Sequence, residues 1–368
     1  MAEPLKNSFA RPVVERIAGM LVDAPGFDAM AFITDALEGF EPLSLTERAR
    51  HISTMLARHL PNDVETALAV IVEALGAPID GDAIEGMDGF VYLPFVFFVA
   101  DHGLDHFEAS MLAQYELTKR FTAEFSIRAF IERYPVETLG RLTEWARDPN
   151  VHVRRLVSEG TRPRLPWAPR IRAFVDDPTP VLALLELLVD DPELYVRRSV
   201  ANNLNDISKD HPEVVVGLCG RLLADPTDGR RWLVRHGLRT LVKAGHPGAL
   251  ALLGYGDGSP VEVAVDIEPG VAAIGGKVKI TVTAINGTES SERLLVDLRI
   301  HFVKASGATS PKVFKGSELE IGAGERASFT RTVSLAQHTT RIHYPGTHEV
   351  DLIVNGQIRT GGAFQLVR

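Results

Sequence analysis

Twelve of the thirteen arginines between residues 154 and 239 of this 368-residue chain form one candidate set, in a stretch where arginine far outnumbers lysine. A guanidinium group is always charged and donates paired hydrogen bonds, which suits it to phosphates and carboxylates. So many cations in one stretch predict a surface that holds several anionic groups at once, such as the phosphates of a nucleic acid. The positions are Arg154, Arg155, Arg162, Arg164, Arg170, Arg172, Arg197, Arg198, Arg230, Arg231, Arg235 and Arg239.

These arginines recur within a repeated pattern. Residues 148–160 (DPNVHVRRLVSEG) and 191–203 (DPELYVRRSVANN) share Asp-Pro and Val-Arg-Arg at a separation of 43 residues, and a weaker copy (WLVRHGLRTLV) follows 38 residues later. Helix pairs that repeat about every 40 residues are typical of HEAT-type solenoids. Equivalent positions face the same way in such an array, so we expect a concave arginine stripe. For any single arginine, the alternative is an ion pair that ties neighbouring repeats together.

Two periodicities divide the chain near residue 250. Before it, apolar residues recur at helical spacing, as in residues 43–60, where Ser44 and Glu47 have the spacing of a capping box. After it, about seven short segments alternate apolar and polar residues, and Asn286-Gly287 and Asn355-Gly356 indicate turns. We therefore predict a multidomain fold. An all-α HEAT-like repeat solenoid spans 1–252, a linker spans 253–260, and an all-β immunoglobulin-like sandwich spans 261–368.

The net charge of −9 argues against nucleic-acid binding until it is divided along the chain. Residues 1–120 carry a charge of −11, residues 121–245 carry +2, and residues 246–368 are neutral. The excess acid therefore belongs to the N-terminal third, and the arginine-rich repeats are free to present a basic face. The total charge still predicts modest nonspecific affinity for DNA at physiological salt.

The composition, with 45% hydrophobic and 24% charged residues, is that of an ordinary globular protein. A single cysteine, Cys219, excludes an intrachain disulfide and a cysteine-cluster metal site, and it fits a reducing compartment. The first residues have no apolar signal-peptide core. The apolar run from Phe90 to Ala100 is too short to span a bilayer, so it predicts a buried helix. We expect a cytoplasmic protein without a membrane contact.

Other motifs for chemistry are weak. His102 and His106 have the spacing of two metal ligands on one helical turn, with Asp101 or Asp105 beside them, but no third spaced ligand motif accompanies them. Capping of a helix start is the favoured interpretation, and we expect no metal. The Gly-rich stretch 254–260 lacks the Lys-Ser/Thr of a phosphate loop, and no Gly-x-Ser-x-Gly nucleophile motif stands out.

Three longer segments carry a resemblance to a known family. They are ELTKRFTAEFSIRAFIERYP (116–135), TEWARDPNVHVRRLVSEGTRPRLPWAPR (143–170) and VRRSVANNLNDISKDHPE (196–213). They resemble the HEAT-like-repeat alkylpurine DNA glycosylases, specifically the AlkC branch of the AlkC/AlkD superfamily. A C-terminal immunoglobulin-like domain distinguishes some AlkC proteins from the shorter AlkD type, which strengthens the resemblance. It covers essentially the whole chain.

The resemblance implies hydrolysis of the N-glycosidic bond of cationic alkylated bases in duplex DNA, such as 3-methyladenine and 3-methylcytosine, to start base excision repair. Such a base is already a good leaving group, and its departure leaves an oxocarbenium-like sugar. The enzyme then needs carboxylates near that charge and an aromatic face, rather than a strong acid. The family also implies a monofunctional glycosylase that needs no cofactor and engages the lesion without a base-specific flipping pocket.

The resemblance further implies four catalytic candidates, and each also has a plainer interpretation. For Glu124, the alternative is an exposed ion pair on a helix with Arg128, four residues later. For Glu159, it is an ion pair with Arg155, one turn earlier, although Glu159 would also project with the arginine stripe. The four candidates are Asp206, Glu159, Trp167 and Glu124.

Trp167 and Asp206 have alternatives of other kinds. Trp167 lies among prolines and arginines, where a loop tryptophan could cover the core. Asp206 could be the N-cap of a following helix. We expect Asp206, Glu159 and Trp167 to contribute most, with Arg155 between the carboxylates and the phosphates.

The expected partner is alkylated double-stranded DNA, bound by a monomer in the bacterial cytoplasm or nucleoid. Two other functions stay open: a non-catalytic HEAT-repeat scaffold that binds a protein partner, and a DNA-damage-binding protein that releases no base. The arginines predicted to contact DNA are Arg154, Arg155, Arg162, Arg164, Arg197, Arg198, Arg230, Arg231 and Arg235.

Overall fold

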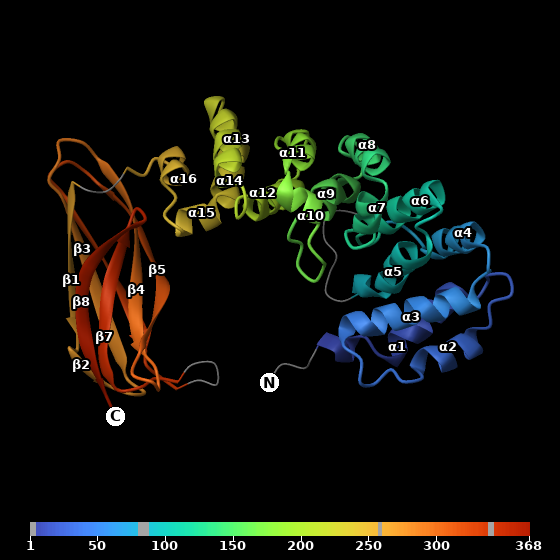
Figure 1. Cartoon of the computed structure of the whole chain (residues 1–368), viewed down its shortest axis with the longest axis horizontal. Helices are drawn as coiled ribbons and strands as arrows, with labels where there is room; N and C mark the ends of the chain where they lie inside the picture. Colours follow the sequence, from blue (N-terminus) through green and yellow to red (C-terminus); the bar gives the residue numbers. More distant parts are fainter. Residues whose placement is uncertain (1–4, 80–87, 257–259, 338–341) are drawn as a thin grey trace. The chain divides into compact units, whose positions relative to one another are not determined.

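The computed structural model describes residues 5–79, 88–256, 260–337 and 342–368. Helices occupy the chain up to residue 252 and strands follow from residue 261, so the predicted helical region followed by a β-sandwich is confirmed (Figure 1). The elements group into two compact units, residues 1–211 with 226–237 and residues 212–225 with 238–368. No helix in these described ranges is both long and apolar enough to cross a membrane.

The first unit is an array of short helices in which α3 packs on α5, α9 on α12, and α12 on α14. Its elements are η1 (Leu5–Ser8), α1 (Arg11–Met20), α2 (Ala29–Leu37), α3 (Leu45–His59), α4 (Val64–Ala74), η2 (Asp88–Tyr92), α5 (Leu93–His102), α6 (Phe107–Thr118), α7 (Ile127–Arg133), α8 (Pro135–Trp145), α9 (Val151–Gly160), α10 (Arg172–Asp176), α11 (Thr179–Glu186), α12 (Leu194–Ile207) and α14 (Asp228–Gly237).

Local signals in the sequence explain where these helices begin. The predicted capping box starts α3, where the backbone N–H of Ser44 donates to Glu47 Oε2 at 2.8 Å. Asn150 caps α9 by accepting a hydrogen bond from the backbone N–H of His152 at 2.9 Å. The apolar run near residue 95 forms the buried helix α5, as predicted.

The two clear copies of the repeat have the same internal hydrogen bonds. Arg154 donates from Nη1 to both carbonyl oxygens of the Asp-Pro turn at residues 148–149. Arg197 donates in the same way to both carbonyls of the turn at residues 191–192. The first arginine of each Val-Arg-Arg therefore closes the turn that precedes its own helix.

The second unit joins three helices to a two-sheet sandwich. One sheet has the strand order β1-β3-β6, and the other has the order β2-β8-β7-β4-β5, in which only β2 and β8 pair in parallel. The elements are α13 (Pro212–Ala224), α15 (Arg239–Lys243), α16 (Pro247–Leu252), β1 (Val261–Glu268), β2 (Val271–Ala273), β3 (Lys277–Asn286), β4 (Glu292–Val303), β5 (Thr309–Ile321), β6 (Arg326–Ser334), β7 (Gly346–Val354) and β8 (Gln357–Val367).

Alternating apolar residues form the core between the two sheets, which is the pattern expected of a sandwich. On β3, Val278, Ile280 and Val282 are fully buried, and they share one cluster with Leu298 of β4 and Phe364 of β8. The intervening residues of β3 are exposed or half-buried. The alternation that predicted strands therefore also decides which face each strand buries.

The last helices are attached tightly to the β7–β8 hairpin. Asn355 and Gly356 both have positive φ, 46° and 82°, as the predicted Asn-Gly turn requires. Gly356 packs so closely on Gly245 that a Cβ on Gly245 would lie 2.5 Å from the Cα of Gly356. Asn355 Nδ2 also donates to the carbonyl of Gly256 at 2.8 Å. Gly256 lies within the predicted linker, whereas residues 257–259 lie outside the described ranges, so the boundaries of the linker stay a prediction.

Candidate active site

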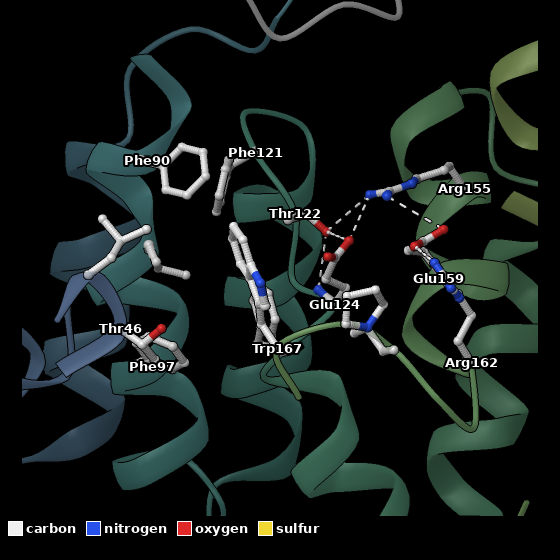
Figure 2. A pocket seen from close by; sticks show the side chains of 15 residues that line it. Thr46, Phe90, Phe97, Phe121, Thr122, Glu124, Arg155, Glu159, Arg162 and Trp167 are labelled. Carbon is white, nitrogen blue, oxygen red and sulfur yellow. Dashed lines mark hydrogen bonds and ion pairs between the residues drawn. The ribbon is translucent and has the colours of Figure 1, made fainter. Parts of the chain in front are cut away.

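The candidate residues come from four segments of the first unit, and Figure 2 shows those that line one pocket. Helix α9 carries Arg155 and Glu159, and α12 carries Asp206 near its end. Trp167 lies in the loop between α9 and α10, and Glu124 lies in the turn before α7. The helix predicted for Glu124 is therefore wrong, and the alternative interpretation of Asp206 as the N-cap of a following helix is excluded because Asp206 lies within α12.

Glu124 bonds a more distant arginine than the one its spacing suggested. Arg155 Nη1 donates to Glu124 Oε2 at 2.8 Å, and the Thr122 hydroxyl donates to the same oxygen at 3.0 Å. The side chain of Glu124 is 14% exposed. The turn before α7 thus aims its carboxylate at α9, and no hydrogen bond among the described residues ends on its other oxygen, Oε1.

Arg162 connects the two remaining carboxylates. Its Nη1 donates to Glu159 Oε1 at 2.6 Å, and its Nε donates to Asp206 Oδ2 at 2.8 Å. The Ser199 hydroxyl donates to Glu159 Oε2 at 2.6 Å, and Lys209 donates to Asp206 Oδ1 at 2.8 Å. Both carboxylates are almost fully buried, with 7% and 3% of their side chains exposed. Every carboxylate oxygen of this pair therefore has a donor.

Charge pairing keeps the site ionised despite its burial. Burial disfavours the charged form of Glu159, but Arg155, Arg162 and the Ser199 hydrogen bond outweigh it and hold the pKa of Glu159 below its ordinary value. Burial likewise acts against Arg155, but Glu124 and Glu159 outweigh it and raise the pKa of this guanidinium. At neutral pH the site is therefore an array of alternating fixed charges.

Trp167 has an unusual backbone and an exposed side chain. Its φ is 64°, in the left-handed region that costs a residue with a Cβ about 1–2 kcal/mol. Its side chain is 68% exposed, so the tryptophan does not cover the core as the alternative interpretation proposed. Strained backbone conformations cluster at functional sites, and this one presents an exposed indole in the same cavity as two carboxylates.

Arg128 holds the loop that carries Trp167. It donates from Nη1 to the carbonyl oxygens of Gly160 at 3.1 Å and Arg162 at 2.7 Å, and from Nη2 to that of Pro169. Burial lowers the pKa of Arg128 to about 10, with nearby acids opposing the shift. Its partners are three backbone carbonyls, because the loop needs its otherwise unpaired carbonyls satisfied.

A cavity of about 320 Å³ opens beside these residues. Glu124, Glu159 and Trp167 line it, together with Arg155 and Arg162. The remaining lining residues are mostly apolar, namely Leu45, Thr46, Phe90, Leu93, Phe97, Phe121, Thr122, Phe125, Leu165 and Pro166. Asp206 is not among the lining residues; it lies behind Arg162.

The nine arginines predicted to contact DNA divide into four groups. Arg154 bonds Asp191 at 2.6 Å, Arg164 bonds Asp210 at 2.6 Å and Arg230 bonds Asp190 at 2.7 Å, which are ties of the kind that the alternative interpretation described. Arg197 closes its own turn, whereas Arg155 and Arg162 hold the carboxylates. The fourth group is exposed to solvent and consists of Arg198, Arg231 and Arg235. Contact with DNA stays a prediction for all of them.

The histidine pair is not arranged as a ligand pair. Helix α5 ends at His102, and His106 stands at the N-cap position of α6, so the two do not share a helical turn. His106 does stand at a helix start, as the capping interpretation expected, but its ring bonds Glu65 at 3.1 Å rather than a backbone N–H. Among the residues that the structure describes, no group of three His, Cys, Asp or Glu side chains could hold a metal ion.

Several contributors were missed from the sequence. Ser199 occupies the repeat position of Leu156, so a hydroxyl at a core position was a usable signal for it. Thr122 lies only two residues from Glu124, but a single threonine there is no distinctive signal, and Arg128 offered none because its carbonyl partners are distant in sequence. Phe90 and Phe97 belong to an apolar run that was interpreted only as core.

Known proteins resemble the chain throughout its length. Residues 119–219 match the family model described as "DNA alkylation repair enzyme", and residues 262–368 match the one described as the C-terminal Ig-like domain of the uncharacterised protein YhaZ. Protein YhaZ of Bacillus subtilis (strain 168) is 37% identical over 348 residues, which are 93% of each chain. The structure of Pseudomonas fluorescens alkylpurine DNA glycosylase AlkC, bound to DNA with an abasic site analogue, is 36% identical, with full coverage of both chains and a TM-score of 0.87.

Proposed function

Because the chain belongs to the AlkC branch of the HEAT-like-repeat alkylpurine DNA glycosylases, we propose that it is a DNA repair glycosylase. It hydrolyses the N-glycosidic bond of cationic alkylated bases in duplex DNA, with 3-methyladenine and 3-methylcytosine as the expected lesions. It thereby starts base excision repair. We further propose that it acts as a monomer in the bacterial cytoplasm or nucleoid and uses no cofactor.

The observation that carries this proposal is the pair of carboxylates, Glu124 and Glu159, that line one cavity with the exposed indole of Trp167. When a cationic base leaves, positive charge moves to the sugar, and fixed carboxylates stabilise that charge. The lowered pKa of Glu159 keeps its carboxylate ionised at neutral pH. The indole face suits a cationic base.

Glu124 is better placed than Asp206 to hold the attacking water. The hydrogen bonds of Glu124 with other described residues end on Oε2, which leaves Oε1 available. Both oxygens of Asp206 accept from side chains, Arg162 and Lys209, and its side chain is 3% exposed. Asp206 then acts by fixing Arg162, and Glu124 is the residue that touches water or sugar.

The lining of the cavity supports two further parts of the proposal. Apart from the paired charges and the hydroxyls of Thr46 and Thr122, it is hydrocarbon and aromatic, so it has few groups to read the edge of a base. This supports engagement of the lesion without a base-specific flipping pocket. None of its lining residues is a lysine that could form a Schiff base with the sugar, which supports a monofunctional glycosylase.

Release of free 3-methyladenine or 3-methylcytosine from methylated duplex DNA tests the proposal. We expect release by the wild type and a loss of at least about a hundredfold in Glu124→Gln, the usual range for a group that assists proton transfer or holds charge. Asp206→Asn should also lose activity. Glu137→Gln, an exposed glutamate on α8, is the matched control and should retain full activity. Absence of release by the wild type would reject the enzyme.

Salt dependence separates the remaining alternatives. If exposed arginines such as Arg198 and Arg231 contact phosphates, DNA affinity should fall steeply with salt, and each alanine substitution should reduce the slope by about 1. A steep slope without base release would identify a DNA-damage-binding protein. A flat response would favour a scaffold for a protein partner.

A further inference from the structure

The cavity extends away from the carboxylates into an aromatic chamber. Phe90 and Phe97 reach it from η2 and α5, Phe121 from the segment before α7, and Thr46 from the start of α3. Figure 2 shows the Trp167 indole between this aromatic group and the Glu124 carboxylate. The chamber therefore begins where the proposed bond cleavage takes place, and its far walls are built by residues that the cleavage itself does not need.

The chamber suits a flat, uncharged, aromatic molecule. The whole cavity, of which the chamber is one part, has a volume of about 320 Å³, at the lower end of the range for small-molecule sites. Phe90 and Phe121 have their ring centroids 5.5 Å apart, so they form one continuous aromatic wall. Beyond the charged residues at its entrance, where Arg155 bonds Glu124 at 2.8 Å, the lining is mostly apolar and aromatic. A neutral ring enters such a lining without losing the hydration of a charge, and it gains stacking on the aromatic rings.

We propose that this aromatic chamber is an exit site that holds the free alkylated nucleobase after the glycosidic bond has broken. The inference rests on the proposed glycosylase function. In that reaction the base leaves with the electron pair of the C–N bond, and its positive charge is thereby cancelled; water supplies the hydroxyl to the sugar carbon and a proton to solvent or a carboxylate. The chamber therefore provides the neutral product with a stacking surface once the cationic lesion has been cleaved.

The consequence is a product-bound state, in which the free base occupies the chamber beside Trp167. Stacking on aromatic side chains contributes about 1–3 kcal/mol per base and does not require a particular base edge. Alkylated purines and pyrimidines should therefore both bind. Added free base should inhibit turnover on methylated DNA, because a base already bound in the chamber prevents the next released base from entering it.

Tryptophan fluorescence of the full-length protein measures binding directly. Trp167 is 68% exposed, whereas Trp145 is 7% exposed and Trp232 is stacked on His236 with centroids 5.0 Å apart. Titration with free 3-methyladenine should therefore give saturable quenching that arises at Trp167. Phe90→Ala should weaken this binding at least about fivefold. The same protein samples should be assayed for base release from methylated duplex.

Phe27→Ala is the matched control. Phe27 is also a half-buried phenylalanine with one ring partner, Phe32 at 5.4 Å, but it does not line the chamber. It should leave the affinity for free base unchanged. Thr46→Met, which fills the chamber without removing an aromatic wall, gives a second test that does not depend on the folding of Phe90→Ala. It should also weaken binding at least about fivefold.

Two outcomes overturn the exit site while the glycosylase stands: excision by the wild type without saturable quenching by free base, or quenching that neither Phe90→Ala nor Thr46→Met weakens. Absence of excision by the wild type would instead remove the proposed function on which the exit site rests. Saturable binding that both chamber variants weaken and Phe27→Ala does not, together with inhibition of turnover, supports it.

Discussion

Replacing Arg162 by alanine tests whether the buried carboxylates are ionised and held by this one side chain. Arg162 donates to Glu159 at 2.6 Å and to Asp206 at 2.8 Å, and 12% of its own side chain is exposed. Removing one partner of a buried ion pair costs about 3–5 kcal/mol, because the other charge stays buried without compensation.

Here the loss should fall at the lower end of that range. Glu159 keeps the Ser199 hydroxyl at 2.6 Å and Arg155 at 3.5 Å, and Asp206 keeps Lys209 at 2.8 Å. We expect the free energy of unfolding to decrease by about 3 kcal/mol at pH 7. Urea unfolding followed by far-ultraviolet circular dichroism measures it.

The arginine two residues later provides the control. Arg164 bonds Asp210 at 2.6 Å, but 22% of each side chain is exposed, so Arg164→Ala should cost no more than about 1 kcal/mol. The loss in Arg162→Ala should also shrink as the pH falls, because protonation of Glu159 removes the uncompensated charge. Equal losses in the two variants, or a loss that grows toward acid pH, would refute the argument.

Three further predictions concern single positions. Because the φ of Trp167 is 64°, the Trp167→Gly variant should unfold at a temperature at least as high as the Trp167→Ala variant. A higher unfolding temperature for the alanine variant would contradict a strained backbone at this position. Because the pKa of Glu159 is lowered in the folded state, its ionisation contributes stability above the unfolded pKa of about 4.3, and this stability is lost as the pH falls through the lower folded pKa. Glu159→Gln should therefore lose less stability than the wild type on acidification. The same decrease in the free energy of urea unfolding at acid pH in both proteins would reject this. Gly245→Ala should lower the free energy of unfolding by about 2–3 kcal/mol, because its Cβ would lie 2.5 Å from the Gly356 Cα and its φ is 74°. Gly287→Ala is the control, since a Cβ there meets no atom within 4 Å. Similar unfolding midpoints for the two variants would count against the contact.

Features that depend on local periodicity were predictable from the sequence. The capping box at Ser44, the buried helix near residue 95 and the Asn355-Gly356 turn all depend on residues a few positions apart, and the structure contains each of them. The helical region precedes the β-sandwich because the spacing of apolar residues changes from helical to alternating near residue 250. In each case the physical cause acts within one helical turn or one hairpin.

Contacts between distant segments were not predictable in the same way. Spacing paired Glu124 with Arg128, four residues away, but its partner is Arg155, 31 residues away. Nothing in a single sequence reports the direction in which a turn aims its side chain. The left-handed backbone of Trp167 was not predictable either, because only a glycine or an asparagine at that position would have suggested a positive φ.

The two repeats show how one of them became a site. The first arginine has the same role in both, because Arg154 and Arg197 each close an Asp-Pro turn. The second arginine differs: Arg155 bonds two carboxylates, whereas Arg198 is exposed. One of these carboxylates, Glu159, takes the place of an asparagine, residue 202, in the next repeat, and the other, Glu124, comes from outside the repeat. The carboxylates therefore distinguish the repeat that carries the site, whereas the arginine pattern, which both repeats share, indicates only the repeated fold.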